Sequence, residues 1–237
     1  MKIETATLCN VGGRQINDDT VTALVSDGTY VFVGDGLGGY AGGKQASQTA
    51  ADVLSDRSRQ GSMLTREAMT GAVEAADRAV RDLQEKTGGE MKTTLVFLAL
   101  EDGKAMWMHV GDSRLYRFRD GSLAWQTKDH SVSQMAVLLG QITVDEIRFH
   151  EDRNRVLRAL GAEKAKPDVS EVLELKEGDA FLLCTDGFWE YVLEPEMEKT
   201  LAKAENPQKW LEAMEEILKT RVSDNNDNYT AAAVFCK

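Results

Sequence analysis

Short apolar segments separated by polar turns dominate much of the chain and predict β-hairpins. In three places, two such segments flank an Asp-Gly dipeptide, which is a common two-residue hairpin turn. The paired segments are 20–26 with 29–34, 94–100 with 104–110, and 115–119 with 123–127. Further strands are expected at 172–175, 181–184 and 230–235. Segment 95–100 is apolar at every position, so we expect both faces of its sheet to be covered.

Helices are predicted where apolar residues recur every three or four positions. Residues 44–57 form one such segment, and 66–86 form a second, whose apolar stripe ends at Gly88-Gly89. Near the C-terminus, Asn206 has the character of a helix N-cap and Pro207 that of a first helical residue. Because hairpins come in runs and helices in blocks, the pattern favours an α+β fold with antiparallel sheets over alternating βαβ units.

The charge and cysteine content narrow the class of protein. The 237 residues include 28 Lys and Arg against 39 Asp and Glu, a net charge of −11. Such a surface argues against non-specific binding to nucleic acid or anionic lipid, and it fits a protein that binds cations. Three cysteines, Cys9, Cys184 and Cys236, cannot all pair and are expected to be buried free thiols. With no secretory signal and no long apolar run, we expect a cytoplasmic protein with one domain over 1–237.

Several aspartates stand at the ends of predicted strands. The Asp-Gly dipeptides at 35–36 and 186–187 differ from hairpin turns because each follows an apolar strand and precedes an apolar residue. A carboxylate there is costly unless positive charge meets it. Other aspartates at strand ends are Asp18, Asp19, Asp112 and Asp227. Taken singly, each is better explained as a cap or turn residue, but together they predict a cluster of oxygen ligands suited to Mg²⁺ or Mn²⁺.

Seven short motifs occur in order between residues 14 and 228. They are Arg14-Gln-Ile-Asn-Asp-Asp19, Asp35-Gly-Leu-Gly-Gly39, Gly111-Asp-Ser-Arg114, Lys128-Asp-His-Ser131, Arg153-Asn-Arg-Val-Leu-Arg-Ala-Leu-Gly161, Cys184-Thr-Asp-Gly-Phe188 and Asp227-Asn228. Each is weak alone, but in this order they resemble the metal-dependent serine/threonine phosphatases of the PPM or PP2C family, in their compact bacterial form. The resemblance implies a four-layer αββα sandwich, in which two antiparallel β-sheets are flanked by helices.

The resemblance also implies a metal centre of two Mn²⁺ or Mg²⁺ ions. Asp35 would bridge the two ions, and the carbonyl of Gly36 would bind one of them. Asp186 and Asp227 would complete the first site. Asp18 falls near the second ion, where the family has glutamate or aspartate, and a shorter acid leaves its direct ligation open.

Other site residues follow from the same resemblance. Asp19 would hold a water molecule of the metal site, and Asp112, with Asp186, would bind a third ion. Arg14 would bind the substrate phosphate, for which its planar fork is suited. One departure is Leu37, which stands where many eukaryotic members have a histidine proposed as general acid. Protonation of the leaving group must then come from water or another residue.

The implied reaction is hydrolysis of phosphoserine or phosphothreonine in proteins, by water activated between the ions and without a phosphoenzyme. The expected partners are phosphorylated proteins and, by analogy, a bacterial serine/threonine kinase that the enzyme opposes. We expect a monomer that binds neither nucleic acid nor membrane. One alternative is a non-catalytic phosphoprotein-binding protein, against which the full set of core acids argues. A second is a phosphatase for small phosphorylated metabolites or for a dedicated partner such as an anti-sigma antagonist.

Two other patterns point elsewhere, but each lacks an essential residue. Residues 38–44 satisfy the Gly-x-x-x-x-Gly-Lys pattern of a P-loop, but Gln45 stands where that loop needs Ser or Thr. Residues 224–228 resemble the start of a calcium loop, but Tyr229 stands where that loop needs glycine. Neither nucleotide nor calcium binding is therefore expected.

The three histidines and one long segment complete the pattern. His109 and His130 are expected to be structural and His150 solvated, because none has the spacing of a zinc pair. Residues 131–165 would form the flap segment that lies beside the active site in this family, beginning with a helical pattern at 131–140. The flap segment is interpreted equally well as a determinant of substrate choice or as a packed connector.

Overall fold

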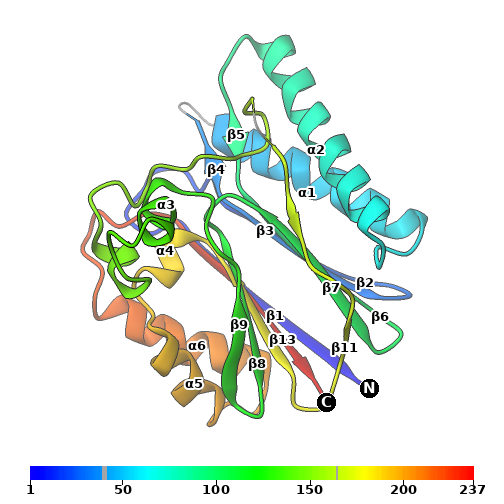
Figure 1. The fold of residues 1–237 in the computed structure, drawn as a ribbon, viewed down its shortest axis with the longest axis vertical. Helices are drawn as coiled ribbons and strands as arrows, with labels where there is room; N and C mark the ends of the chain where they lie inside the picture. Colours follow the sequence, from blue (N-terminus) through cyan, green and yellow to red (C-terminus); the bar gives the residue numbers. More distant parts are fainter. Residues whose placement is uncertain (39–41, 164) are drawn as a thin grey trace.

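Two antiparallel β-sheets pack face to face at the centre of the molecule, and helices cover both outer faces (Figure 1). This computed structural model describes residues 1–38, 42–163 and 165–237. Part of the glycine-rich motif at 35–39, and of the P-loop-like pattern at 38–44, lies outside the described residues. The layering confirms the expected αββα sandwich.

The first sheet has five strands in the order β1-β13-β12-β8-β9. Their bounds are β1 (Ile3–Asn10), β13 (Tyr229–Cys236), β12 (Ala180–Cys184), β8 (Arg114–Arg119) and β9 (Ser122–Gln126). Its outer face packs on α5 (Glu194–Leu201) and α6 (Pro207–Lys219), where Phe118 and Leu182 lie in one apolar cluster with Trp210 and Met214.

The second sheet has β7 (Lys104–Val110), β6 (Leu95–Glu101), β3 (Thr29–Gly34) and β2 (Thr20–Val25) in that order, with β10 (Asp168–Val169) and β11 (Leu173–Glu174) both paired to β7. Its outer face packs on α1 (Gly42–Gln60) and α2 (Arg66–Thr87). A small third sheet joins β4 (Gly36–Leu37) to β5 (Lys92–Thr93).

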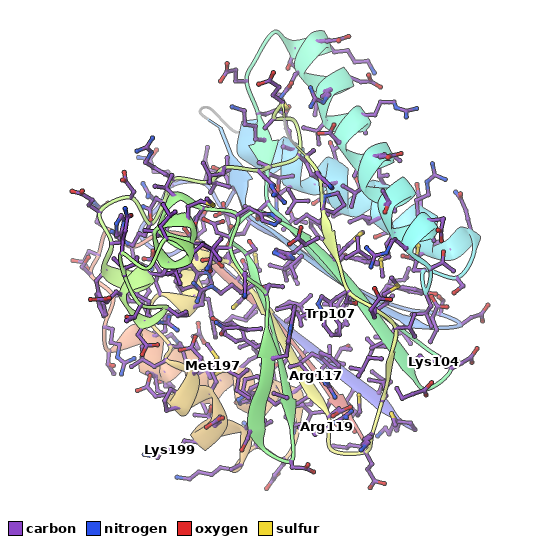
Figure 2. The ribbon with its side chains drawn as sticks, viewed as in Figure 1. Lys104, Trp107, Arg117, Arg119, Met197 and Lys199 are labelled. Carbon is purple, nitrogen blue, oxygen red and sulfur yellow. The ribbon has the colours of Figure 1, made fainter. Side chains whose placement is uncertain are left out.

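A third apolar layer separates the two large sheets. Val33 and Leu98 of the second sheet meet Phe181 and Val234 of the first within this layer. Figure 2 shows the same space from one open edge, where Trp107 on β7 and Arg117 and Arg119 on β8 are labelled, with Met197 and Lys199 on α5 outside it. Because apolar residues fill both faces of β3 and β6, these strands are buried at nearly every position, as expected from their sequence.

Most helix and strand ends predicted from capping and turn residues lie within one or two residues of the observed ends. Asn206 caps α6 by accepting a hydrogen bond from the Lys209 amide, and Gly88 ends α2 in the left-handed conformation, with φ of 70°. Strand β1 and helix α5 were not expected. One prediction was wrong: Cys9 is exposed rather than buried, because β1 is the edge strand of its sheet and alternate side chains face solvent.

The flap segment contains α3 (Val132–Leu138) and the 3₁₀ helix η1 (Asp145–Phe149). The Ser131 hydroxyl caps α3 by accepting from the amide of Gln134. Several apolar residues of this segment face solvent, since Met135, Leu138 and Leu139 are exposed. None of the described helices is both long and apolar enough to cross a lipid bilayer.

Candidate active site

The residues proposed from the sequence converge on one open cavity of about 460 Å³ at one end of the sandwich. Those that line it are Arg14, Asp18, Asp35, Gly36, Asp112, Asp186 and Asp227. They meet because β3, β7 and β12 all end there, whereas β13 begins there. Asp19 is the one proposed residue that is absent from the described cavity lining, and it is buried just behind it.

Asp35 follows β3 and is fixed by the start of β6. Its amide donates to the Thr94 hydroxyl at 2.9 Å, and its carbonyl accepts from the Thr94 amide at 2.9 Å. The Thr94 hydroxyl also lies 2.6 Å from that of Ser113, next to Asp112. The strand ends that carry Asp35 and Asp112 are therefore tied together through Thr94, although they are far apart in sequence.

Asp186 and Asp227 are brought together by a close approach of two main chains. A Cβ atom at Gly187 would lie 2.0 Å from the Asn228 carbonyl oxygen, so only glycine fits between these segments. The Gly187 amide donates to the Asp186 carboxylate at 2.7 Å. On the other side, Arg14 forms a two-pronged contact with Asp227, at 3.0 Å from Nε and 3.0 Å from Nη2.

The loop that carries Arg14 and Asp18 is held by Asn228, to which the sequence analysis assigned no role. Its amide group donates to the carbonyls of Val11 and Ile16 at 2.8 and 3.0 Å, and its carbonyl accepts from the Asp18 amide at 2.9 Å. Asn228 is buried, and three of its hydrogen bonds are thus used to shape this loop.

Asp18 and Asp19 differ sharply in surroundings. The Asp18 carboxylate accepts from the Lys44 amide at 2.9 Å, near the start of α1, where the helix dipole favours an anion. Asp19 is buried and accepts from the Thr185 hydroxyl at 2.9 Å. Thr185 belongs to one of the seven sequence motifs, but the sequence does not indicate its role. In the structure, its hydroxyl holds the Asp19 carboxylate.

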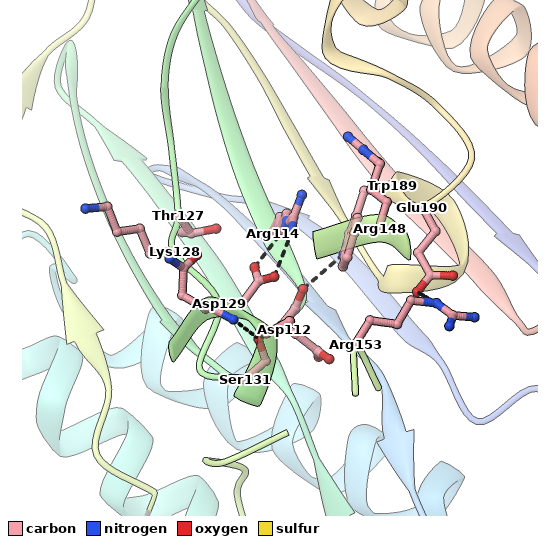
Figure 3. Close-up of polar contacts among 12 residues, drawn as sticks. Asp112, Arg114, Thr127, Lys128, Asp129, Ser131, Arg148, Arg153, Trp189 and Glu190 are labelled. Atoms are coloured by element: carbon pink, nitrogen blue, oxygen red, sulfur yellow. Dashed lines mark hydrogen bonds and ion pairs between the residues drawn. The ribbon is translucent and has the colours of Figure 1, made fainter. Parts of the chain in front are cut away.

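Asp112 lies on a main-chain loop that is clamped from two sides. His130 donates its amide to the Gly111 carbonyl at 2.9 Å and accepts from the Gly111 amide at Nδ1, 3.1 Å away. The Trp189 indole donates to the Asp112 carbonyl at 3.0 Å (Figure 3). The expectation that His130 makes structural hydrogen bonds near the site is therefore confirmed.

Comparison with known proteins decides the family. The family model described as protein phosphatase 2C matches residues 10–226. The chain belongs to the protein phosphatase 2C family. The serine/threonine protein phosphatase PstP of Mycobacterium tuberculosis is 32% identical to this PP2C chain over 197 residues, which are 81% of this chain and 36% of PstP. The serine/threonine phosphatase stp of Listeria monocytogenes is 32% identical over 178 residues, 72% of this chain and 71% of stp.

Solved structures agree with the family assignment. The crystal structure of M. tuberculosis PstP/Ppp has a TM-score of 0.88 and 28% identity, over 100% of both chains. The catalytic domain of PstP in complex with two manganese ions has a TM-score of 0.84 and 29% identity, over 98% of this PP2C chain and 97% of that domain. The expected family and fold are confirmed by these likenesses, and the relatives named here are serine/threonine phosphatases. The chain spans about a third of the length of PstP.

The electrostatics of this PP2C cavity fit a divalent cation. Burial raises the pKa of Asp35 well above its usual range, and the charge of Asp19 adds to the effect. Burial, followed by repulsion from Asp186, does the same to the pKa of Asp112. Among the described residues that line the cavity, Arg14 is the one basic side chain. Clustered acids with so little compensating charge, offering hard oxygen atoms, are the donor set that Mg²⁺ and Mn²⁺ favour.

Removal of metal is expected to make the stability of this chain depend on pH. Burial raises the pKa of Asp186 to about 6 and that of Asp19 to about 7, above the 3.8 of an unperturbed aspartate. A raised folded-state pKa stabilises at low pH, and the benefit is lost as pH rises through that pKa. In EDTA, the free energy of unfolding should fall by about 2–4 kcal/mol between pH 5 and 8.

Urea unfolding followed by circular dichroism at several pH values measures this slope. Saturating Mn²⁺ should abolish it, because a bound cation favours the ionised carboxylates. If the free energy of unfolding in EDTA instead rose from pH 5 to pH 8, burial would not raise the pKa of these acids in the folded state.

A second group of candidate ligands, His109, His130 and Asp168, lies outside this cavity. Since His130 Nδ1 accepts from the Gly111 amide, the neutral ring carries its proton on Nε2, which faces Asp168 at 3.4 Å. Arg158 Nη1 lies 3.2 Å from the same Nε2. The guanidinium of Arg158 therefore already places a positive charge beside this group, and His130 offers no free lone pair. The group does not fit a metal ion.

Proposed function

We propose that this PP2C-family chain hydrolyses phosphoserine and phosphothreonine in proteins with the help of two Mn²⁺ or Mg²⁺ ions. The observation that carries the proposal is the set of acids from separate strand ends around one cavity, with Arg14 at its rim. The PstP catalytic domain in complex with two manganese ions supports the choice of metal. A kinase that the enzyme opposes, a monomeric state and a cytoplasmic location belong to the same proposal.

Asp35 would hold both ions, and the carbonyl of Gly36 would bind one of them. Asp186 and Asp227 would complete the first site, and Asp18 lies near the second. When bound, the ions would supply an activated water and neutralise charge on the phosphate. Asp18 keeps one carboxylate oxygen on the Lys44 amide, so its orientation is fixed by α1. Asp19, held by Thr185, would hold a water molecule of the site.

Arg14 would bind the substrate phosphate. A guanidinium has five N–H groups in a planar fork, and the contact with Asp227 uses only Nε and Nη2. The Arg14 side chain is half exposed at the cavity, and its remaining N–H groups have no hydrogen-bond partner among the described residues, so they can donate to phosphate oxygens. Leu37 cannot act as a general acid, so the leaving group must take its proton from water or another residue.

Phosphate release from a phosphothreonine peptide tests this function, with Mn²⁺ and with EDTA. Turnover that needs the metal is the expected result. The same assay with small phosphorylated metabolites tests the alternative substrate class, which would be favoured if metabolites turned over faster than peptides. A folded chain that binds Mn²⁺ but releases no phosphate from either would indicate a non-catalytic phosphoprotein-binding protein.

Asp112 is expected to act at a third ion together with Asp186. The variant Asp112→Asn keeps the size of the side chain but removes its charge, so turnover at micromolar Mn²⁺ should fall at least about tenfold. Turnover measured across a range of Mn²⁺ concentrations checks this, with recovery expected at high Mn²⁺. Wild-type turnover at low Mn²⁺ would show that a third ion is dispensable.

A further inference from the structure

We propose that Trp189 is a positioning residue that fixes Asp112 and links it to the flap segment. The inference rests on the proposed role of Asp112 in metal binding. Trp189 belongs to α4 (Asp186–Trp189), so the short helix that begins with one proposed ligand ends with the residue that holds another. Its indole N–H donates to the main-chain carbonyl of Asp112 at 3.0 Å, and both residues are buried (Figure 3).

The indole ring is held against two guanidinium groups. Arg114 Cζ lies 3.4 Å from the ring centroid, within the range of a cation–π contact. Arg114 is itself immobilised, because Nε and Nη2 donate to the Asp129 carboxylate at 2.9 and 2.8 Å and Nη1 donates to the Tyr116 hydroxyl. The ring plane, and with it the direction of the N–H, is thus fixed by a buried ion pair.

The other guanidinium comes from the flap segment. Arg148, on η1, has Cζ at 5.4 Å from the Trp189 ring centroid, and Nη2 donates to Glu194 at 2.6 Å. Its Nη1 is buried without a hydrogen-bond partner among the described residues. The indole ring is therefore a second contact of this buried cation, beside its ion pair with Glu194, and displacement of the flap segment would move Arg148 away from Trp189.

Trp189 differs from the other contacts of the Asp112 loop in what it reaches. His130 clamps Gly111 and also contacts the flap segment, because its carbonyl accepts from the Leu157 amide at 2.7 Å and its Nε2 lies 3.2 Å from Arg158 Nη1. The contact of Ser113 with Thr94 stays within the strand ends that form the cavity. Trp189 alone among these described contacts bonds the Asp112 main chain on one side and packs against η1 on the other. The position of Asp112 itself is therefore coupled to η1 of the flap segment through this ring, separately from the contacts that His130 makes with residues 157–158.

The variant Trp189→Phe tests this, because phenylalanine keeps an aromatic ring but has no N–H. Trp210→Phe is the matched control: Trp210 is equally buried and its N–H also donates to a main-chain carbonyl, that of Met197 at 3.0 Å, but Met197 does not line the cavity as Asp112 does. Calorimetric titration with Mn²⁺ should show that Trp189→Phe weakens the same binding step as Asp112→Asn, about tenfold. Trp210→Phe should bind Mn²⁺ as the wild type does.

Wild-type Mn²⁺ binding by folded Trp189→Phe, or an equal loss in Trp210→Phe, would overturn the proposal. Should the Trp189 variant fail to fold, Arg148→Met decides. It removes the flap cation and keeps an apolar stem, so it should weaken the same step, whereas unchanged binding would refute the coupling. These titrations need no turnover. If the wild-type chain bound Mn²⁺ but released no phosphate, the proposed function would be refuted. Weaker Mn²⁺ binding by Trp189→Phe than by the wild type would then still support the positioning role.

Discussion

Asp35→Asn is expected to lower turnover of a phosphothreonine peptide at least about a thousandfold, with the fold intact. The proposed position of Asp35 between two ions means that loss of its charge weakens both sites at once. Burial of the neutral amide carries less cost than burial of a carboxylate, so the variant in EDTA should be as stable as the wild type or more stable. Phosphate release, Mn²⁺ titration and thermal unfolding in EDTA measure the three effects.

The matched control is Asp27→Asn, which changes the same dipeptide in an exposed hairpin turn between β2 and β3. It should leave turnover and Mn²⁺ binding unchanged. If folded Asp35→Asn turned over substrate at the wild-type rate, the bridging role would be wrong, and the acids around the cavity would need another explanation.

Arg14→Ala should raise KM for the phosphopeptide about 10- to 100-fold and change kcat much less, because a charge-assisted, two-pronged phosphate contact contributes mainly to substrate binding. The variant also removes the cation that pairs with Asp227, and no other basic side chain lines the described part of the cavity to replace it. Kinetics must therefore be measured at saturating Mn²⁺, so that any change in metal affinity does not enter KM.

Two further variants separate the causes. Arg14→Lys keeps the charge but cannot form the planar fork, so it should recover part of the loss. Arg59→Ala removes an arginine of similar exposure that pairs with Asp56 far from the cavity, and KM should not change. An unchanged KM in Arg14→Ala would mean that another group binds the phosphate.

The hairpins and helix ends followed from sequence because their causes are local. The dipeptides at 102–103 and 120–121 adopt positive φ at both residues, as a two-residue turn requires, and Asn206 and Gly88 cap their helices. The pairing of β1 with β13 was out of reach, since it joins segments about 220 residues apart in the chain and β1 itself has no clear alternation.

The residues of the candidate site also fall into two groups, those that the sequence predicts and those whose role depends on a contact with a distant segment. The acids were found because aspartates after buried strands are unusual, and the motif order added their roles. Asn228, Thr185 and Trp189 were missed because their contribution is a contact with a distant main-chain or side-chain atom. No pattern of residue types along the chain encodes such a contact, which exists only once the strand ends have met.

The pairing of β1 with β13 also determines where the two ends of the chain could be joined and where new ends could be opened. Lys2 and Lys237 exchange main-chain hydrogen bonds, so the two ends lie side by side, while Asn10 and Tyr229, near the cavity, form the opposite end of the same ladder. A strand of eight residues separates these ends by roughly 25 Å. A peptide of a few residues would therefore close the backbone into a ring, and new ends opened at the exposed Asp120-Gly121 turn would give a circular permutant with its cavity residues in their original places.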